Sequence, residues 1–140
     1  MPAHDPDCLF CKILDGALPA QIVDEDERTV AFMDINPATR GHALVIPRDH
    51  GEDLYSTAPQ DVAATAVAAQ RLALRIRDRL GAEGVNLLTA CRPAAWQTVF
   101  HYHVHVIPRY ADDPLRLPWI PGAGDMDEIA AAAARLRGDA

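Results

Sequence analysis

Three histidines at alternate positions, His101, His103 and His105, form the pattern that points most plainly to chemistry. In a β-strand, side chains two residues apart share a face, so the three imidazoles would form one row about 13 Å long. Neutral imidazole binds metal ions, and it also attacks phosphorus as a nucleophile while a neighbouring imidazole stabilises charge. The row predicts a metal site or a nucleophilic centre. The alternative is three strand histidines without a function.

A second pattern lies near the N-terminus, where Cys8 and Cys11 are separated by two residues. This spacing is typical of a zinc knuckle, which needs two further ligands to close a tetrahedral site. The alternatives are a redox dithiol, which would need a thioredoxin-like order of elements, and two small core residues. Cys91 has no evident partner, and three cysteines without a visible secretory signal argue against a disulfide scaffold.

The composition indicates a soluble globular domain. The chain has 140 residues, 49% of them hydrophobic and 24% charged, with a formal net charge of −7. We expect a single domain over 1–140, with 1–6 as a flexible tail. The negative charge argues against a nucleic acid polymer as partner, whereas a small phosphate ester can still be bound by local groups. Neither a membrane span nor a signal is visible, which predicts a cytoplasmic protein.

Alternating and continuous apolar runs predict the strands. They are expected over 29–33, 43–46, 85–89 and 98–107, with the first two forming a hairpin-like pair and Pro108 ending the last. The predicted fold class is α+β, an antiparallel sheet of about five strands with one long helix packed across it.

Helical periodicity predicts that long helix between the second and third strands. Apolar residues recur every three or four positions over 62–80, after a capping box at 57–60 and before Gly81 as the end. A short C-terminal helix is expected between Asp125 and Gly138.

The stretch Gln97–Arg109 resembles the signature of the histidine triad family, in which three histidines alternate with apolar residues. Upstream, the chain resembles the Hint-type branch at Phe10, Asp34, Ile35, Pro37, Gly41, His42 and the run Leu44–Pro47. The resemblance covers nearly the whole chain from Cys8 to Arg109. It implies the family's α+β fold, a homodimer whose two sheets join, and nucleotidyl transfer through a covalent intermediate on the middle histidine, His103.

The same resemblance assigns roles around His103. His105 would contact the α-phosphate, Gln97 and Thr98 would lie near the leaving group, and Asp34 would bind the ribose hydroxyls. The further candidates for nucleotide binding are Phe10, Ile35, His42 and Leu44. For the apolar residues the alternative is plain core packing, and for Asp34 it is turn capping. The implied substrate is an ester or phosphoramidate of a purine nucleotide such as AMP, or a dinucleoside polyphosphate.

The resemblance extends to bacterial members of this branch that contain zinc. It implies a structural zinc ion held by Cys8, Cys11, His50 and His101. A closed site of this kind would fix the orientation of His101 and leave His103 free for chemistry. A catalytic metal bound by all three triad histidines is the competing hypothesis.

The loop before the triad departs from the family's pattern. Ala90 stands where an asparagine is common, and Arg92 and Trp96 replace glycines. Because Pro93 and the lost glycines restrict φ and ψ, we expect a stiffer loop whose N–H groups are displaced from the substrate phosphates. Arg92 is a candidate phosphate ligand, and Trp96 a candidate to stack on a leaving group or to fill a dimer contact. The alternative function is a nucleotide-binding regulatory module with little turnover.

Overall fold

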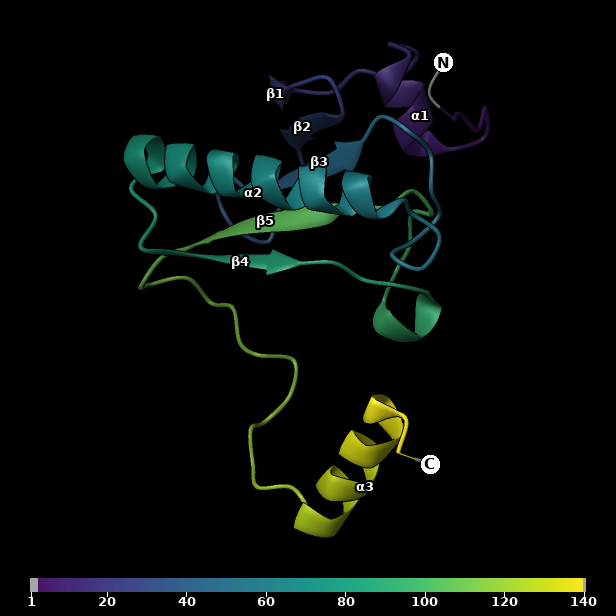
Figure 1. Ribbon diagram of the computed structural model, residues 1–140. Coiled ribbons are helices and arrows are strands. Elements are labelled where there is room, and N and C mark those ends of the chain that lie inside the picture. The colour runs from purple at the N-terminus through teal and green to yellow at the C-terminus, as the bar shows by residue number, and fades with distance from the viewer. Residues whose placement is uncertain (1–2, 140) are drawn as a thin grey trace.

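Apolar strands build a five-stranded antiparallel sheet in the computed structural model, which describes residues 3–139 (Figure 1). In sheet order the strands are β1 (Ile22–Glu25), β2 (Thr29–Met33), β3 (Ala43–Pro47), β5 (Val104–Arg109) and β4 (Gly84–Leu88). The helices are α1 (Leu9–Leu14), α2 (Pro59–Leu80) and α3 (Met126–Arg137), with a short 3₁₀ turn, η1 (Pro93–Ala95). The predicted α+β class, antiparallel sheet and long helix are confirmed.

The neighbouring strands β2 and β3 are buried on both faces, because the sheet is covered on each side. On one face, Ala31 and Val45 pack with Leu72 of α2, the helix that lies across the sheet in Figure 1. On the other face, Phe32 and Leu44 pack with residues of α1 and its N-cap. Leu44 pairs with His105 across β3 and β5, so this second face carries the triad side chain that lies in a strand.

The last strand differs from its prediction. A strand is present as expected, but its predicted start at 98 is wrong, since β5 begins at Val104 and leaves His101 and His103 in irregular backbone. Pro108 does not end β5 either, and instead lies within it opposite Val85 of β4. The β3 ladder reaches only as far as Val106, so at Pro108 the strand has one neighbour and its missing N–H costs no ladder bond.

The helix ends were predicted better than the helix starts. Gly81 ends α2 with φ 72°, as expected, but the capping box at 57–60 is wrong, because the N-cap is Ala58. The Thr57 hydroxyl instead donates to the Asp53 carbonyl oxygen at 2.7 Å. At α3 both expected caps are present: the Asp125 carboxylate accepts N–H groups of the first turn, and Gly138 has φ 84°. The elements α1, β1 and η1 were not predicted.

The described part of the N-terminal segment contacts the rest of the chain. The Ala3 N–H donates to the Asp49 carboxylate at 2.6 Å, and the His50 N–H donates to the Ala3 carbonyl oxygen at 2.8 Å. A flexible tail was expected over 1–6, and residues 1–2 of it lie outside the described part of the chain. Among the described helices, none combines the length and apolar character needed to cross a bilayer.

Candidate active site and metal centre

Two cysteines and two histidines from three separate segments of the chain lie close together, and one of them is the first triad histidine. Cys8 caps α1, Cys11 lies in its first turn, His50 follows β3, and His101 precedes β5. The Sγ atom of Cys8 lies 3.5 Å from His101 Nδ1, Cys11 Sγ lies 3.5 Å from His50 Nδ1, and the two Nδ1 atoms are 3.2 Å apart. The ligand atoms of these four residues all lie within 4.8 Å of one another.

The spacing of these four atoms fits a tetrahedral zinc ion. Zinc bond lengths imply separations of about 3.6 Å between sulfur and nitrogen and about 3.3 Å between two nitrogens. The observed separations are 3.5, 3.6 and 3.2 Å. His101 is fully buried, and its Nε2–H donates to the Pro47 carbonyl oxygen at 2.8 Å, which leaves Nδ1 with its lone pair toward the thiols. Burial raises the pKa of Cys11 to about 11, so a cation is needed to hold that thiol as thiolate.

His103 is held in one tautomer by the backbone. Its Nδ1 lies 2.7 Å from the His101 carbonyl oxygen, and a carbonyl only accepts, so Nδ1 carries the proton and Nε2 the lone pair. The ring is buried, with Phe10 at 5.1 Å between centroids in an edge-on contact. Burial lowers the pKa of His103, against the opposing effects of the His101 carbonyl and Asp34. The imidazole is therefore neutral at neutral pH, with Nε2 available as a nucleophile.

His105 is oriented by His42. The Ala38 N–H donates to His42 Nδ1 at 2.9 Å, which places the His42 proton on Nε2. That Nε2 lies 2.9 Å from His105 Nδ1, which must then accept, so the remaining nitrogen of His105, Nε2, carries a proton. Burial and the neighbours His103 and His42 lower the pKa of His105 to about 4, against the attraction of Asp34. The pair thus presents a neutral N–H donor beside the lone pair of His103.

These side chains line a cavity of about 590 Å³ between α1, the ends of β2 and β3, and the loop before β5. Its lining includes most of the predicted site residues, namely Phe10, Asp34, Ile35, His42, Leu44, Thr98, His103 and His105. Asp34 Oδ1 also accepts the Asn36 N–H at 2.7 Å, so the turn capping considered as an alternative is present. Its other oxygen lies 3.5 Å from His42 Nε2. The cavity is largely apolar, with a carboxylate and imidazoles at one end.

Three of the predicted catalytic and nucleotide-binding residues, Gln97, Arg92 and His101, do not line this cavity. The Gln97 amide is buried and donates to the Glu52 and Val99 carbonyl oxygens at 2.6 and 3.1 Å. The Arg92 guanidinium lies 2.8 Å from the Asp53 carboxylate. Nor do the three triad imidazoles share one candidate metal position among the described residues, since His101 Nδ1 points to the cysteines.

The loop before the triad keeps a backbone that suits the glycines it lacks. Arg92 and Trp96 have φ of 76° and 77°, in the left-handed region that favours glycine. The substitutions have therefore left the local conformation glycine-like, contrary to the expected restriction. Sequence reasoning missed Asp53, whose buried carboxylate anchors Arg92 from the segment before α2. Its only local signal, an aspartate before Ser56 and Thr57, is that of an ordinary turn.

An α+β fold with three alternating histidines, one in β5 and two in the segment before it, defines the class of histidine triad proteins. The HIT domain family model matches residues 15–112, and the chain belongs to this family. A relative from Bacillus subtilis, named protein hit, is 44% identical over 74% of this chain and 71% of its own.

Two solved structures are similar to this chain over nearly its whole length. A zinc-bound histidine triad family protein from Mycobacterium smegmatis is 42% identical, with a TM-score of 0.77 over 96% of this chain and 98% of its own. A histidine triad nucleotide-binding protein from Candida albicans is 28% identical, with a TM-score of 0.81 over 95% of this chain and 96% of its own.

Proposed function

We propose that the protein is a nucleotide hydrolase or nucleotidyl transferase that acts on esters or phosphoramidates of a purine nucleoside monophosphate such as AMP. The observation that carries this proposal is the 2.7 Å hydrogen bond from His103 Nδ1 to the His101 carbonyl oxygen. It leaves a neutral Nε2 at the wall of the cavity, which is the state a nucleophilic imidazole needs.

In the first step, His103 Nε2 forms a bond to the α-phosphorus while the bond to the leaving oxygen or nitrogen breaks. The leaving group takes the electron pair and then a proton. In the second step, water attacks phosphorus and loses a proton to the solvent, and the N–P bond breaks with its electron pair returning to His103 Nε2. The nucleoside monophosphate is released and neutral His103 is regenerated. The Nε2–H of His105, whose tautomer is set by His42, would donate to a phosphoryl oxygen in both steps. The nearby carbonyl of His101 stabilises the positive charge that His103 gains on attack.

The cavity supports a nucleotide as the bound group. Phe10, Ile35 and Leu44 offer apolar walls for a base, and Asp34 offers a carboxylate for hydroxyl donors. Family proteins are generally nucleotide hydrolases or transferases, and the Candida albicans relative is named a nucleotide-binding protein. Arg92 does not support the proposal in its observed position, because a phosphate contact would require the Asp53 ion pair to break.

The test is to trap the intermediate. Wild type mixed with an adenosine phosphoramidate and quenched in acid-free denaturant should carry an adenylyl adduct on the peptide that contains His103. His103→Ala should lose the adduct and steady-state turnover, whereas His4→Ala, which alters a histidine that contacts Asp15 away from the cavity, should keep both. Turnover by His103→Ala at the wild-type rate would overturn the proposal. Nucleotide binding by wild type without any adduct would instead favour the regulatory module.

We further propose that a structural zinc ion joins Cys8, Cys11, His50 and His101. The support is the tetrahedral spacing of the ligand atoms and the zinc-bound Mycobacterium smegmatis relative. When bound, the ion would brace α1 and the backbone of His101, and so hold the carbonyl oxygen that orients His103.

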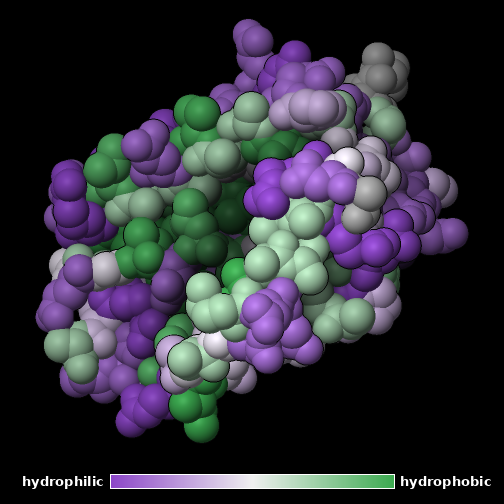
Figure 2. Space-filling view, turned by 60° about the horizontal axis from the view of Figure 1, so that its bottom comes forward, coloured by the Kyte–Doolittle hydropathy of each residue, from purple (hydrophilic) through white to green (hydrophobic). Residues whose placement is uncertain are grey.

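A homodimer formed through β4 is also proposed. All five residues of this edge strand are exposed, including Val85, Leu87 and Leu88. Figure 2, in which the lower side of the molecule in Figure 1 is turned toward the viewer, shows hydrophobic side chains around a hollow. A polar edge would not need a partner, whereas an apolar one invites strand pairing. Light scattering should give twice the chain mass, and Leu87→Lys should reduce it. The single domain and the cytoplasmic location stay predictions.

A further inference from the structure

The two residues with left-handed backbone differ in what compensates them. Arg92 is tied down, because its guanidinium contacts Asp53 at 2.8 Å and lies 5.3 Å from the centroid of the Tyr55 ring. Its N–H also donates to Gln97 Oε1 at 2.7 Å. These contacts over-determine the start of the loop and offset the unfavourable φ.

Trp96 has no comparable compensation from folding. Its N–H donates to the Pro93 carbonyl oxygen at 3.0 Å, a bond that glycine would make equally well. The residue is 64% exposed, so burial of the indole contributes little to stability. A large side chain that strains the backbone and stays in solvent is a candidate for function, since strain of this kind gathers at ligand sites.

The indole is placed at the substrate cavity. Trp96 lines it together with Thr98 and His103, and the rigid anchoring of Arg92 and Gln97 fixes the loop that presents it. The walls suited to a base come from α1, β3 and the end of β2, whereas Trp96 comes from a different segment, the loop between β4 and β5. Because attacking and leaving groups lie roughly in line at phosphorus, a leaving group departs away from His103 and toward the open part of the cavity.

We propose that Trp96 is a specificity-determining residue that stacks on the leaving group, so that the preferred substrates join a nucleoside monophosphate to a planar aromatic group. This proposal rests on the proposed nucleotidyl transfer. An exposed indole offers an aromatic face, and aromatic pairs are favoured by an amount equivalent to about twofold to tenfold in rate. An aliphatic leaving group of the same size gains no such contact.

The test uses a matched pair of adenosine phosphoramidates, one made from 2-phenylethylamine and one from 2-cyclohexylethylamine. Both amines have the same carbon skeleton and similar basicity, so their chemical reactivity is nearly equal. Wild type should favour the aromatic substrate in kcat/KM by about twofold to tenfold. In Trp96→Leu the ratio should fall to about one, and Trp96→Phe should restore most of it. Since Trp96→Gly relieves the backbone, its melting temperature should equal or exceed that of wild type.

The possible outcomes distinguish the stacking role of Trp96 from the nucleotidyl transfer on which it rests. An unchanged aromatic preference in Trp96→Leu, or no preference in wild type, would overturn the stacking role while leaving nucleotidyl transfer intact. A lack of turnover of both substrates by wild type would instead count against the proposed function. A Trp96→Leu protein with half the mass of wild type in light scattering would show that the indole serves the dimer, and would also overturn the stacking role.

Discussion

His42 Nε2 lies 2.9 Å from His105 Nδ1, and this contact decides which nitrogen of His105 carries its proton. The proton on His42 is fixed in turn by the Ala38 N–H, which donates to Nδ1 at 2.9 Å. The Ala38 N–H therefore sets the tautomer of His42 and, through His42, that of His105. His42 was expected only as part of the nucleotide-binding set, and these contacts favour a positioning role for it.

The first prediction concerns this chain of hydrogen bonds. His42→Ala removes the donor to His105 Nδ1, which lets His105 take the other tautomer and lose its N–H donor toward the phosphate. We expect kcat on an adenosine phosphoramidate to fall about 100-fold, a size typical of a lost proton donor. His42→Gln, whose amide can donate to the same atom, should recover part of that loss. Equal rates for the Ala and Gln variants would show that a hydrogen-bond donor at this position does not control the activity of His105.

The second prediction is a pH dependence of stability from His105. Its folded pKa of about 4 lies below the value of 6.5 for an exposed histidine. The unfolded chain therefore binds more protons between these values, so the stabilising effect is present above pH 6.5 and is lost as pH falls toward 4. Asp34 opposes this lowering of the His105 pKa. Burial also lowers the pKa of His42 and of His103, so both groups add to the loss of stability on acidification.

Between pH 7 and pH 5, the His105 contribution to the free energy of unfolding should fall by about 1–2 kcal/mol. Urea unfolding of wild type and His105→Asn at the two pH values measures it, with zinc content checked at each. The variant should lose less stability than wild type on acidification. Identical losses would assign the pH dependence to other groups.

The third prediction concerns the Cys8–Cys11 knuckle. If the four ligands hold zinc, the purified protein should contain about one metal ion per chain, and chelation should lower the melting temperature sharply. Cys8→Ser and His50→Ala should both lose zinc, whereas Cys91→Ser, which changes the cysteine outside the cluster, should keep it. Full zinc content in Cys8→Ser would refute the assigned ligand set.

The alternating histidines lie close together in the structure, but strand periodicity explains only part of their arrangement. Strand periodicity places His101, His103 and His105 on one face, yet only His105 lies in β5. His101 contacts residues far along the chain, the Pro47 carbonyl oxygen and the Cys8 thiol, and His103 hydrogen-bonds in turn to the His101 carbonyl oxygen. Those tertiary contacts override the local preference for a strand, and alternation alone does not report them.

For the loop before β5, too, the local sequence predicts only part of the structure. The loss of family glycines at Arg92 and Trp96 was visible, but the positive φ that both residues retain was not. The partner of Arg92, Asp53, is 39 residues away, and no spacing rule connects them. By contrast, the central strands and the C-caps of α2 and α3 follow local rules, and these were predicted closely.

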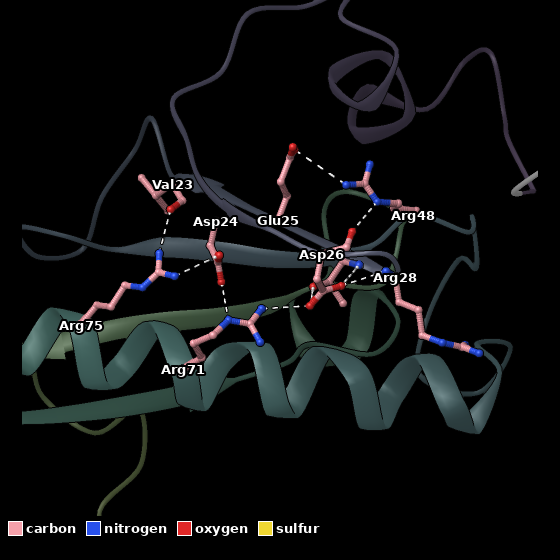
Figure 3. Close-up of polar contacts among 9 residues, drawn as sticks. Val23, Asp24, Glu25, Asp26, Arg28, Arg48, Arg71 and Arg75 are labelled. Carbon is pink, nitrogen blue, oxygen red and sulfur yellow. Dashed lines mark hydrogen bonds and ion pairs between the residues drawn. The ribbon is translucent and has the colours of Figure 1, made fainter.

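The fourth prediction concerns the arginines of α2 that contact the acidic strand β1 (Figure 3). Arg71 donates to Asp24 at 2.7 Å and to Asp26 at 2.9 Å, and Arg75 also reaches Asp24 at 3.2 Å. The hydrogen bonds that Asp26 accepts, from the backbone of Arg28 and from Arg71, outweigh burial and lower its pKa to about 2. The side chain of Asp24 is only 11% exposed, so the two arginines replace much of the water that would otherwise contact its carboxylate.

Arg71→Ala should therefore destabilise the fold by about 1–2 kcal/mol, because it leaves a mostly buried carboxylate with one arginine and also removes a packed stem. Arg77→Ala is the matched control on the same helix. Its partner Asp78 is adjacent in sequence, and both side chains are more than 60% exposed, so we expect a change within about 0.5 kcal/mol. Urea unfolding at low and high salt measures both variants. If Arg71→Ala unfolds at the same midpoint as Arg77→Ala, β1 is held by its ladder with β2 and the ion pairs contribute nothing measurable.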